Sequence, residues 1–181
     1  HVEQGVAEIS SKCEEVHVIG ISMGGVLGLH LATIFPLNSL VEAAAVFQFK
    51  NEFNVRVLVP LLNWLITKKS KQSQYKKNGN LKMNFIGYSE YPMKALNQMR
   101  KLTNFVRPQL SKVNCPTLLI HTKADLTSPF KNFHIVKNLI SSDKKNNLIL
   151  EKSTHNLFGP GPEQVFIFKQ VLSFLQKNKS N

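Results

Sequence analysis

The amino-acid sequence predicts an α/β fold in which a mostly parallel sheet is flanked by helices. Short apolar stretches rich in β-branched residues alternate along the chain with longer segments of helical length. Strands that are apolar throughout are typical of a parallel sheet covered on both faces. The basic, amphipathic stretch at 50–107 departs from this alternation, and we interpret it as a helical insertion that divides the core into 1–49 and 108–181.

The order of the elements follows from hydrophobic periodicity and from breaker residues such as Pro36, which ends a helix. Before the insertion, the expected elements are a helix at 2–13 with Val6, Ile9 and Cys13 on one face, a strand at 16–21, a helix to about 35 and a strand at 40–47. The insertion is expected to hold a few helices, with turns at 78–80 and 91–92. After it, we expect a strand at 117–121, a helix at about 129–140, a strand at 147–151 and a final helix at 163–176. The final helix is expected to bury Val165, Phe166, Phe168, Val171, Leu172 and Leu175.

A Gly-x-Ser-x-Gly motif stands between the first strand and the helix that follows it, with Ser22 at its centre. Strand, tight turn and helix in this order are typical of the nucleophile elbow of a serine hydrolase. The turn predicts a strained backbone at Ser22 and small residues two positions away on each side, which Gly20 and Gly24 provide. The Met23 N–H, at the helix N-terminus, is expected to form half of an oxyanion hole.

An elbow of this kind predicts an acid and then a histidine, each in a loop after a later strand. Asp125 lies four residues beyond the strand at 117–121, and His155 follows the last strand. Both are therefore expected at the carboxyl edge of the sheet, where active sites of open parallel sheets lie. The rival acids are less suitable, because Asp143 opens a turn and Glu151 lies within a strand. The remaining histidines are expected to be structural or on the surface: His1, His17, His30, His121 and His134.

With these motifs the chain resembles the α/β-hydrolases, and in particular small bacterial carboxylesterases and monoacylglycerol lipases. The resemblance rests on residues 20–25, on 115–121 leading to Asp125, and on 153–155. It implies a Ser22-His155-Asp125 triad and a helical cap at 50–107. It also implies further strands before the nucleophile strand, for which the 21 residues that precede Ser22 leave too little room.

We therefore expect a partial α/β-hydrolase fold, corresponding to the C-terminal portion of a larger hydrolase. One edge of the strand at 16–21 is expected to have no partner within the chain, which is an aggregation hazard. The first oxyanion donor would also be missing. The isolated chain is accordingly expected to be a poor catalyst and a poor folder.

The function that these features favour is hydrolysis of short or medium acyl esters, including monoacylglycerols. The apolar residues of the insertion are expected to form either the roof of the acyl pocket or the core of the cap: Val55, Leu58, Leu61, Leu62, Trp64, Leu65 and Ile66. Two alternatives stay open: the same triad acting on a thioester, lactone or carbon–carbon bond, and a non-catalytic binding protein on the same scaffold.

The net charge of +12 is concentrated in the insertion, which holds 12 basic and 2 acidic residues. This distribution, without a nucleic-acid-binding motif, argues against a nucleic-acid partner. The basic segment 68–77 indicates either a solvated face or attraction to an anionic lipid surface. Cys13 and Cys115 lack metal spacing, so we expect buried thiols, no metal and no cofactor. Without an export signal, the expected location is the cytoplasm. The sequence does not predict an oligomeric state.

Overall fold

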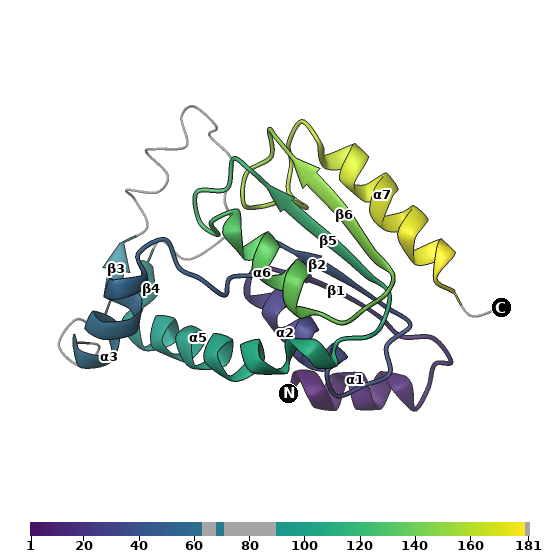
Figure 1. Ribbon diagram of the computed structural model, residues 1–181, viewed down its shortest axis with the longest axis horizontal. Helices are drawn as coiled ribbons and strands as arrows, with labels where there is room; N and C mark the ends of the chain where they lie inside the picture. The colour runs from purple at the N-terminus through teal and green to yellow at the C-terminus, as the bar shows by residue number, and fades with distance from the viewer. Residues whose placement is uncertain (63–67, 71–89, 180–181) are drawn as a thin grey trace. The chain divides into compact units, whose positions relative to one another are not determined.

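The computed structural model describes residues 1–62, 68–70 and 90–179. The chain forms two compact units, His1–Lys50 with Thr103–Asn181, and Asn51–Leu102. The first unit contains a four-stranded sheet in the order β1-β2-β5-β6, in which every neighbouring pair is parallel (Figure 1). Its strands are β1 (His17–Ile21), β2 (Ser39–Ala43), β5 (Thr117–Thr122) and β6 (Lys145–Leu150). The predicted α/β fold with a parallel sheet is confirmed.

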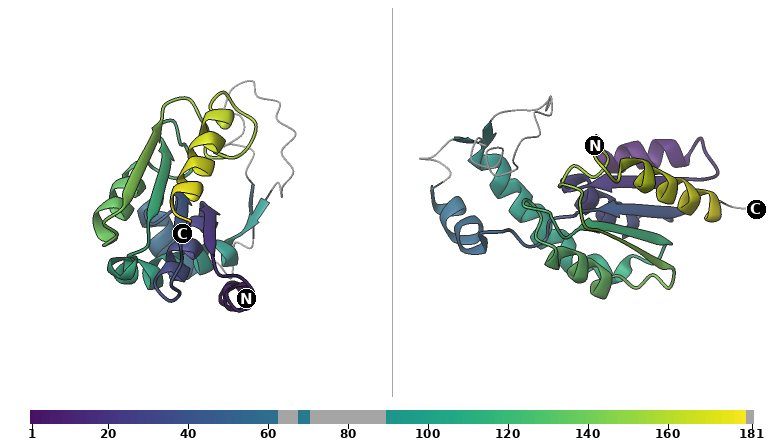
Figure 2. Two further views of the ribbon diagram at one scale, coloured as in Figure 1. Left: turned by 90° about the vertical axis from the view of Figure 1, so that its right-hand side faces the viewer. Right: turned by 90° about the horizontal axis from the view of Figure 1, so that it is seen from above.

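Helices cover both faces of this sheet, because side chains along each strand alternate between the faces. On one face α2 (Met23–Ala32) packs closely, and a Cβ at its Gly28 would lie 3.0 Å from a Leu40 methyl carbon. The other face is covered by α7 (Gln164–Lys177; Figure 2). This helix buries Ile167, Val171 and Phe174. The remaining helices of this unit are α1 (Val2–Ser10), a 3₁₀ helix (Arg107–Lys112) and α6 (Lys131–Leu139).

The hydrophobic core beneath α7 is built from residues of three parallel strands. The strands β2 and β5 are buried along their full length, whereas β1 and β6 are the edge strands within the described part of the chain. The core members are Val41, Ala43, Ala44, Leu118, Ile120, Leu150, Leu157, Ile167, Val171 and Phe174. This arrangement places the carboxyl ends of β1, β5 and β6 at one edge of a rigid sheet.

The first helix is shorter than the sequence predicts. It ends at Ser10, and the next residues form a turn in which the Cys13 N–H donates to the Ile9 carbonyl. The side chain of Val6 is buried, but Ile9 is 51% exposed and Cys13 is exposed as well. The predicted burial of Cys13 is therefore wrong, as is the extension of the helix to residue 13. Cys115 is partly buried, and this burial raises the pKa of its thiol.

The buried face of α7 also differs from the prediction. Val165 and Leu172 are 66% and 57% exposed, and Phe166 and Phe168 are about half exposed. Apolar residues surround most of this helix, so its own periodicity does not single out one buried face. Of the predicted residues, Val171 is buried and Leu175 is partly buried, and contact with the sheet buries Ile167 and Phe174 in addition.

The strand predicted at 40–47 ends early, at Ala43. The next residue, Ala44, has a φ of 50°, in the left-handed region that side chains other than glycine rarely adopt. The chain therefore turns away from the sheet instead of continuing as a strand. Two side-chain contacts described below hold this turn.

The second unit contains a π-helix (Asn54–Leu58), α3 (Val59–Leu62), an antiparallel pair of β3 (Lys68–Ser70) and β4 (Glu90–Pro92), and most of α5 (Met93–Val106). The prediction of helices alone, with a turn at 91–92, is wrong, because these residues pair with β3. Val55 is buried, whereas Leu58 and Leu61 are exposed. The predicted turn at 78–80 and residues 64–66 and 71–77 lie outside the described residues. In the described chain, no helix has the length and apolar character needed to cross a bilayer.

Candidate active site

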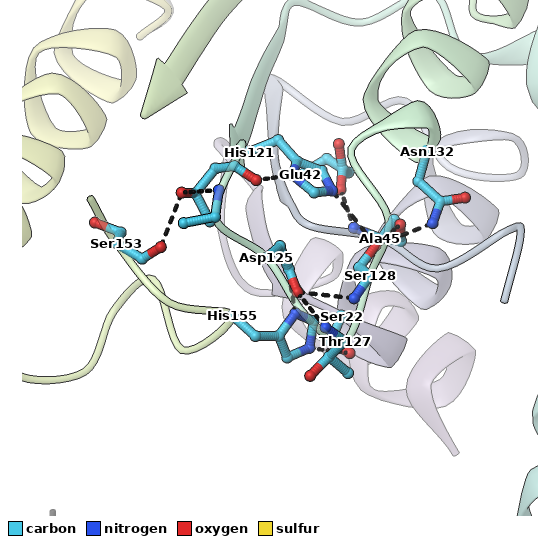
Figure 3. A network of polar contacts seen from close by, with 12 residues as sticks. Ser22, Glu42, Ala45, His121, Asp125, Thr127, Ser128, Asn132, Ser153 and His155 are labelled. Carbon is cyan, nitrogen blue, oxygen red and sulfur yellow. Dashed lines mark hydrogen bonds and ion pairs between the residues drawn. The ribbon is translucent and has the colours of Figure 1, made fainter. Parts of the chain in front are cut away.

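The three predicted triad residues follow three parallel strands of the first unit. Ser22 comes directly after β1, Asp125 follows β5 and His155 follows β6. Because the strands are parallel, these loops meet at one edge of the sheet, and Figure 3 shows the three side chains side by side. The structure thus brings together residues that are up to 133 positions apart in the sequence.

Hydrogen bonds join the three side chains in series. Asp125 Oδ2 lies 2.7 Å from His155 Nδ1, and His155 Nε2 lies 2.9 Å from Ser22 Oγ (Figure 3). The Asp125 side chain is fully buried, while that of His155 is 24% exposed. An imidazole placed between a buried carboxylate and a serine hydroxyl can accept the hydroxyl proton and retain a stabilised positive charge. This is the geometry of an activated serine nucleophile.

Backbone geometry holds Ser22 in place. Its φ of 57° and ψ of −115° lie outside the regions common for L-residues, as expected for a nucleophile elbow. Its N–H donates to the Ala43 carbonyl at 2.8 Å. A Cβ at Gly20 would overlap the Gly24 carbonyl oxygen, so glycine is required there. A Cβ at Gly24 would meet nothing within 4 Å, so the predicted steric demand on Gly24 itself is wrong.

The buried carboxylate of Asp125 is held through its second oxygen. Asp125 Oδ1 accepts the N–H groups of Thr127 and Ser128 at 2.7 and 2.8 Å. Both oxygens therefore face donors, which is the environment that an ionised carboxylate needs when it is buried. The contacts also fix the direction of Oδ2 toward the imidazole.

The loop that carries His155 is held by two residues that the sequence analysis did not single out. The Thr122 hydroxyl, at the end of β5, donates to the Ser153 carbonyl at 2.8 Å. Glu163 Oε2 accepts the Lys152 N–H at 3.1 Å and the Ser153 hydroxyl at 2.6 Å. Although burial acts in the opposite direction, these hydrogen bonds lower the pKa of Glu163. In the sequence, Thr122 and Glu163 stand out only by being polar residues close to a predicted catalytic loop. Such residues are too common there to indicate a role.

Met23 is the first residue of α2, with Ser22 as the N-cap. The first N–H groups of a helix have no acceptor within it, and the helix dipole places partial positive charge there. The Met23 N–H is thus located where a negatively charged oxygen on a Ser22 adduct could be bound.

The rival acids from the sequence lie away from this arrangement. Glu151 pairs with Lys123 at 2.6 Å, with both side chains more than half exposed, and Asp143 is exposed. His17 contacts Ser39, and His30 contacts Glu3 at 2.7 Å. No cluster of three or more potential metal ligands occurs within the described ranges.

Comparison with known proteins agrees with this geometry. The family model described as "Serine aminopeptidase, S33" matches residues 2–160. The chain belongs to this family. The chain is therefore an α/β-hydrolase of the serine hydrolase type, and the resemblance found in its sequence is confirmed.

Among curated proteins, this α/β-hydrolase is 26% identical over 191 residues to a thermostable monoacylglycerol lipase from a Bacillus species, covering 98% of the chain and 69% of the relative. It is 24% identical over 166 residues to a carboxylesterase from Bacillus subtilis, covering 91% of the chain and 65% of the relative. The chain thus spans about two thirds of the length of these relatives.

Solved structures show the same fold. A monoacylglycerol lipase from Paleococcus ferrophilus superposes with a TM-score of 0.76 at 13% identity, covering 98% of this chain and 75% of that one. A soluble variant of the monoglyceride lipase from Saccharomyces cerevisiae gives 0.74 at 12% identity, covering 99% and 67%. At these identities the likeness supports the fold, and the substrate has to be argued from the site.

Proposed function

We propose that this protein hydrolyses carboxylic esters of short or medium acyl chains, with monoacylglycerols as the leading substrate class. The observation that carries the proposal is the hydrogen-bonded series from Asp125 through His155 to Ser22, at the end of a tight strand–helix turn. The ester class is supported by the relatives, a monoacylglycerol lipase and a carboxylesterase.

In the proposed reaction, Ser22 Oγ attacks the ester carbonyl while its proton moves to His155 Nε2. Asp125 holds the imidazole and stabilises its positive charge, and the Met23 N–H binds the oxyanion. The imidazolium then gives the proton to the leaving alcohol, and an acyl group remains on Ser22. A water molecule gives a proton to His155 and attacks the acyl carbonyl, and the imidazolium then returns the proton to Ser22 Oγ as the acid leaves.

Covalent labelling of the nucleophile tests this proposal directly. A fluorophosphonate reacts with an activated serine, so the full-length protein should be labelled on Ser22, and Ser22→Ala should not be labelled. Thr127→Ala, which keeps the Thr127 backbone N–H, is a matched control that should be labelled normally. Absence of labelling in a folded protein would favour the non-catalytic alternative.

A substrate panel then separates the reaction classes. p-Nitrophenyl esters of increasing acyl length and monoacylglycerols test the ester proposal. An aminoacyl anilide tests the amide reaction that the family description names, and a thioester and a lactone test the remaining alternatives. Turnover of the anilide in preference to every ester would overturn the proposed substrate class.

We also propose that the basic segment 68–77, which holds five lysines, attracts an anionic lipid surface. Vesicles with negatively charged lipids should bind the protein. The binding should weaken as salt is added, because the electrostatic screening length shortens to about 8 Å near physiological ionic strength. Neutral vesicles are the control. Equal binding to both vesicle types would support a solvated face without a lipid role.

A further inference from the structure

A buried carboxyl group lies directly beneath the candidate active site and has no role in the reaction described above. Glu42, on the central strand β2, is 2% exposed. A buried carboxyl group is unfavourable unless it is hydrogen-bonded, and Glu42 Oε1 accepts the Ala45 N–H at 2.6 Å. This contact closes a turn over residues 42–45, in which Ala44 lies.

The turn that Glu42 closes is strained. Ala44 has a φ of 50°, which costs free energy in any residue with a Cβ. Its N–H donates to the Ile120 carbonyl of β5 at 2.9 Å. The turn therefore depends on contacts at Ala44 and Ala45, and the Glu42 carboxyl provides the shorter of these two hydrogen bonds.

We propose that Glu42 is a positioning residue for the hydrolytic reaction, acting by fixing the turn at Ala44 and Ala45 on which both the Ser22 elbow and the Asp125 loop rest. This inference depends on the proposed function only for its catalytic readout. Its structural part concerns the turn alone.

The turn contacts the Ser22 elbow on one side. The Ala43 carbonyl, at the start of the turn, accepts the Ser22 N–H at 2.8 Å. The first turn of α2 is equally close, since a Cβ at Gly25 would lie 3.3 Å from Glu42 Oε1 and 3.2 Å from the Ala45 Cβ. A shift of the turn would therefore move the nucleophile.

On the other side the turn contacts the loop of the acid. The Ala45 carbonyl accepts the Ser128 hydroxyl at 3.1 Å, and the Ser128 N–H donates to Asp125 Oδ1 at 2.8 Å (Figure 3). Asn132 supports the same junction, because its Nδ2 donates to Ser128 Oγ at 3.0 Å and its Oδ1 accepts the Phe47 N–H. Ala45 thus links Glu42, which accepts its N–H, to the triad acid through Ser128, which donates to its carbonyl.

Three variants test the proposal in the full-length protein. Glu42→Gln keeps an acceptor oxygen at the same place, Glu42→Leu removes it, and Leu40→Ala is a matched control on the same strand face. A displacement of reacting groups by about 1 Å can reduce the rate on the order of 10²-fold. We therefore expect Glu42→Leu to lower kcat toward ester substrate by about that factor with KM nearly unchanged, and Glu42→Gln to restore most of it. Leu40→Ala should lower the melting temperature and leave kcat close to that of the wild type.

A second measurement separates failure of this inference from failure of the proposed function. Amide hydrogen exchange at Ala45 and Ser22 should become faster in Glu42→Leu and stay slow in Glu42→Gln, whatever the enzyme turns over. If Glu42→Leu does not fold, Ser128→Ala removes the hydrogen bond to the carbonyl of the same residue, Ala45, and should lower kcat. Unchanged exchange at both amides, or equal losses of kcat in Glu42→Gln and Glu42→Leu, would overturn the positioning role.

Discussion

The two regions that supply the candidate triad hold their side chains by different means. Ser22 is fixed by the local backbone, through its own strained dihedral angles and the close approach of Gly20 to the Gly24 carbonyl. Asp125 and His155 lie on loops fixed by hydrogen bonds from distant segments, such as those of Glu163 to the His155 loop. One region depends on steric exclusion and the other on polar contacts.

The difference predicts how each region responds to substitution. An overlap between a new Cβ and the backbone cannot be relieved by rotating a side chain, so a substitution in the elbow should cause a large loss of stability in one step. A loop held by several hydrogen bonds should lose function gradually, because each bond contributes about 1 kcal/mol. Substitutions in the two regions can therefore test this difference.

The largest effect is expected where the two regions meet, in the triad itself. Ser22→Ala and His155→Ala should each reduce kcat toward a reactive ester by about 10⁴-fold or more, and Asp125→Asn by about 10⁴-fold. Because the groups act as a unit, the double variant Ser22→Ala with His155→Ala should lose little more than either single variant. Steady-state kinetics on active-site-titrated protein measures all four values.

A histidine outside the site provides the control for this series. His134 is exposed on α6, and its ring forms an edge-to-face contact with that of Phe130, with the ring centroids 5.3 Å apart. His134→Ala should change kcat by less than about twofold, in line with surface substitutions in general. Normal turnover by His155→Ala would show that another group is the base.

The next largest effect is expected within the elbow. Gly20→Ala introduces a Cβ into the Gly24 backbone, so the strand or helix has to shift, and we expect a loss of about 3 kcal/mol or more in the free energy of unfolding. Gly24→Ala meets nothing within 4 Å and replaces a glycine in a helix, so stability should be unchanged or higher by up to about 1 kcal/mol. Chemical denaturation compares the two. Equal losses would contradict steric control of the elbow.

The same difference explains what could be predicted from the sequence. The elbow is encoded within six consecutive residues, so Ser22, its strand and its helix were evident from the motif and its flanks. Asp125 and His155 are predicted from their order in the chain and their positions after strands. The α/β fold followed from the alternation of apolar strands and helices, because burial on both faces of a parallel sheet leaves few alternatives.

The contacts that hold the loops were not predictable in the same way. Glu163 lies next to Ser153 only because β6 and α7 pack as they do, and Asn132 bonds to Phe47 from 85 positions away. Glu42 lies in a fully buried strand, and its hydrogen-bond partner is decided by the turn at Ala44. The buried face of α7 is predicted only in part for a related reason, because apolar residues surround the helix and contact with the sheet decides which of them are buried.

Glu42 links the two regions, and its burial predicts a pH effect on stability. Burial raises the pKa of Glu42 to about 7 from the model-compound value of 4.5, although the Ala45 N–H opposes this. The folded state therefore binds a proton that the unfolded state has lost, and the free energy of unfolding should decrease as pH rises from 4.5 to 7. Burial has the opposite effect on His121, which lies on the neighbouring strand β5 and whose pKa is lowered.

Glu42→Gln does not titrate and should remove this dependence. Relative to the wild type, the Gln variant should become more stable between pH 5 and pH 8 by on the order of 3 kcal/mol, since a tenfold change in proton affinity is about 1.4 kcal/mol. Urea denaturation of both proteins at the two pH values measures the difference. A constant difference would indicate that Glu42 is ionised in the folded protein throughout.

The smallest effect is expected in the loop of His155. Glu163→Ala removes the acceptor for the Lys152 N–H and the Ser153 hydroxyl but leaves the contact of Ser153 with Thr122. We expect kcat to fall by about tenfold with KM unchanged, because His155 is held less firmly while one anchor remains. Glu151→Ala is the matched control, since its exposed pair with Lys123 should contribute little.

The lowered pKa of Glu163 adds a pH test. The stabilisation of the loop by the Glu163 carboxylate is complete above pH 4.5 and is lost as pH falls below that value, so the two variants should differ less in acid. Equal activity of the two variants at neutral pH would show that the His155 loop is fixed by its backbone, as the elbow is.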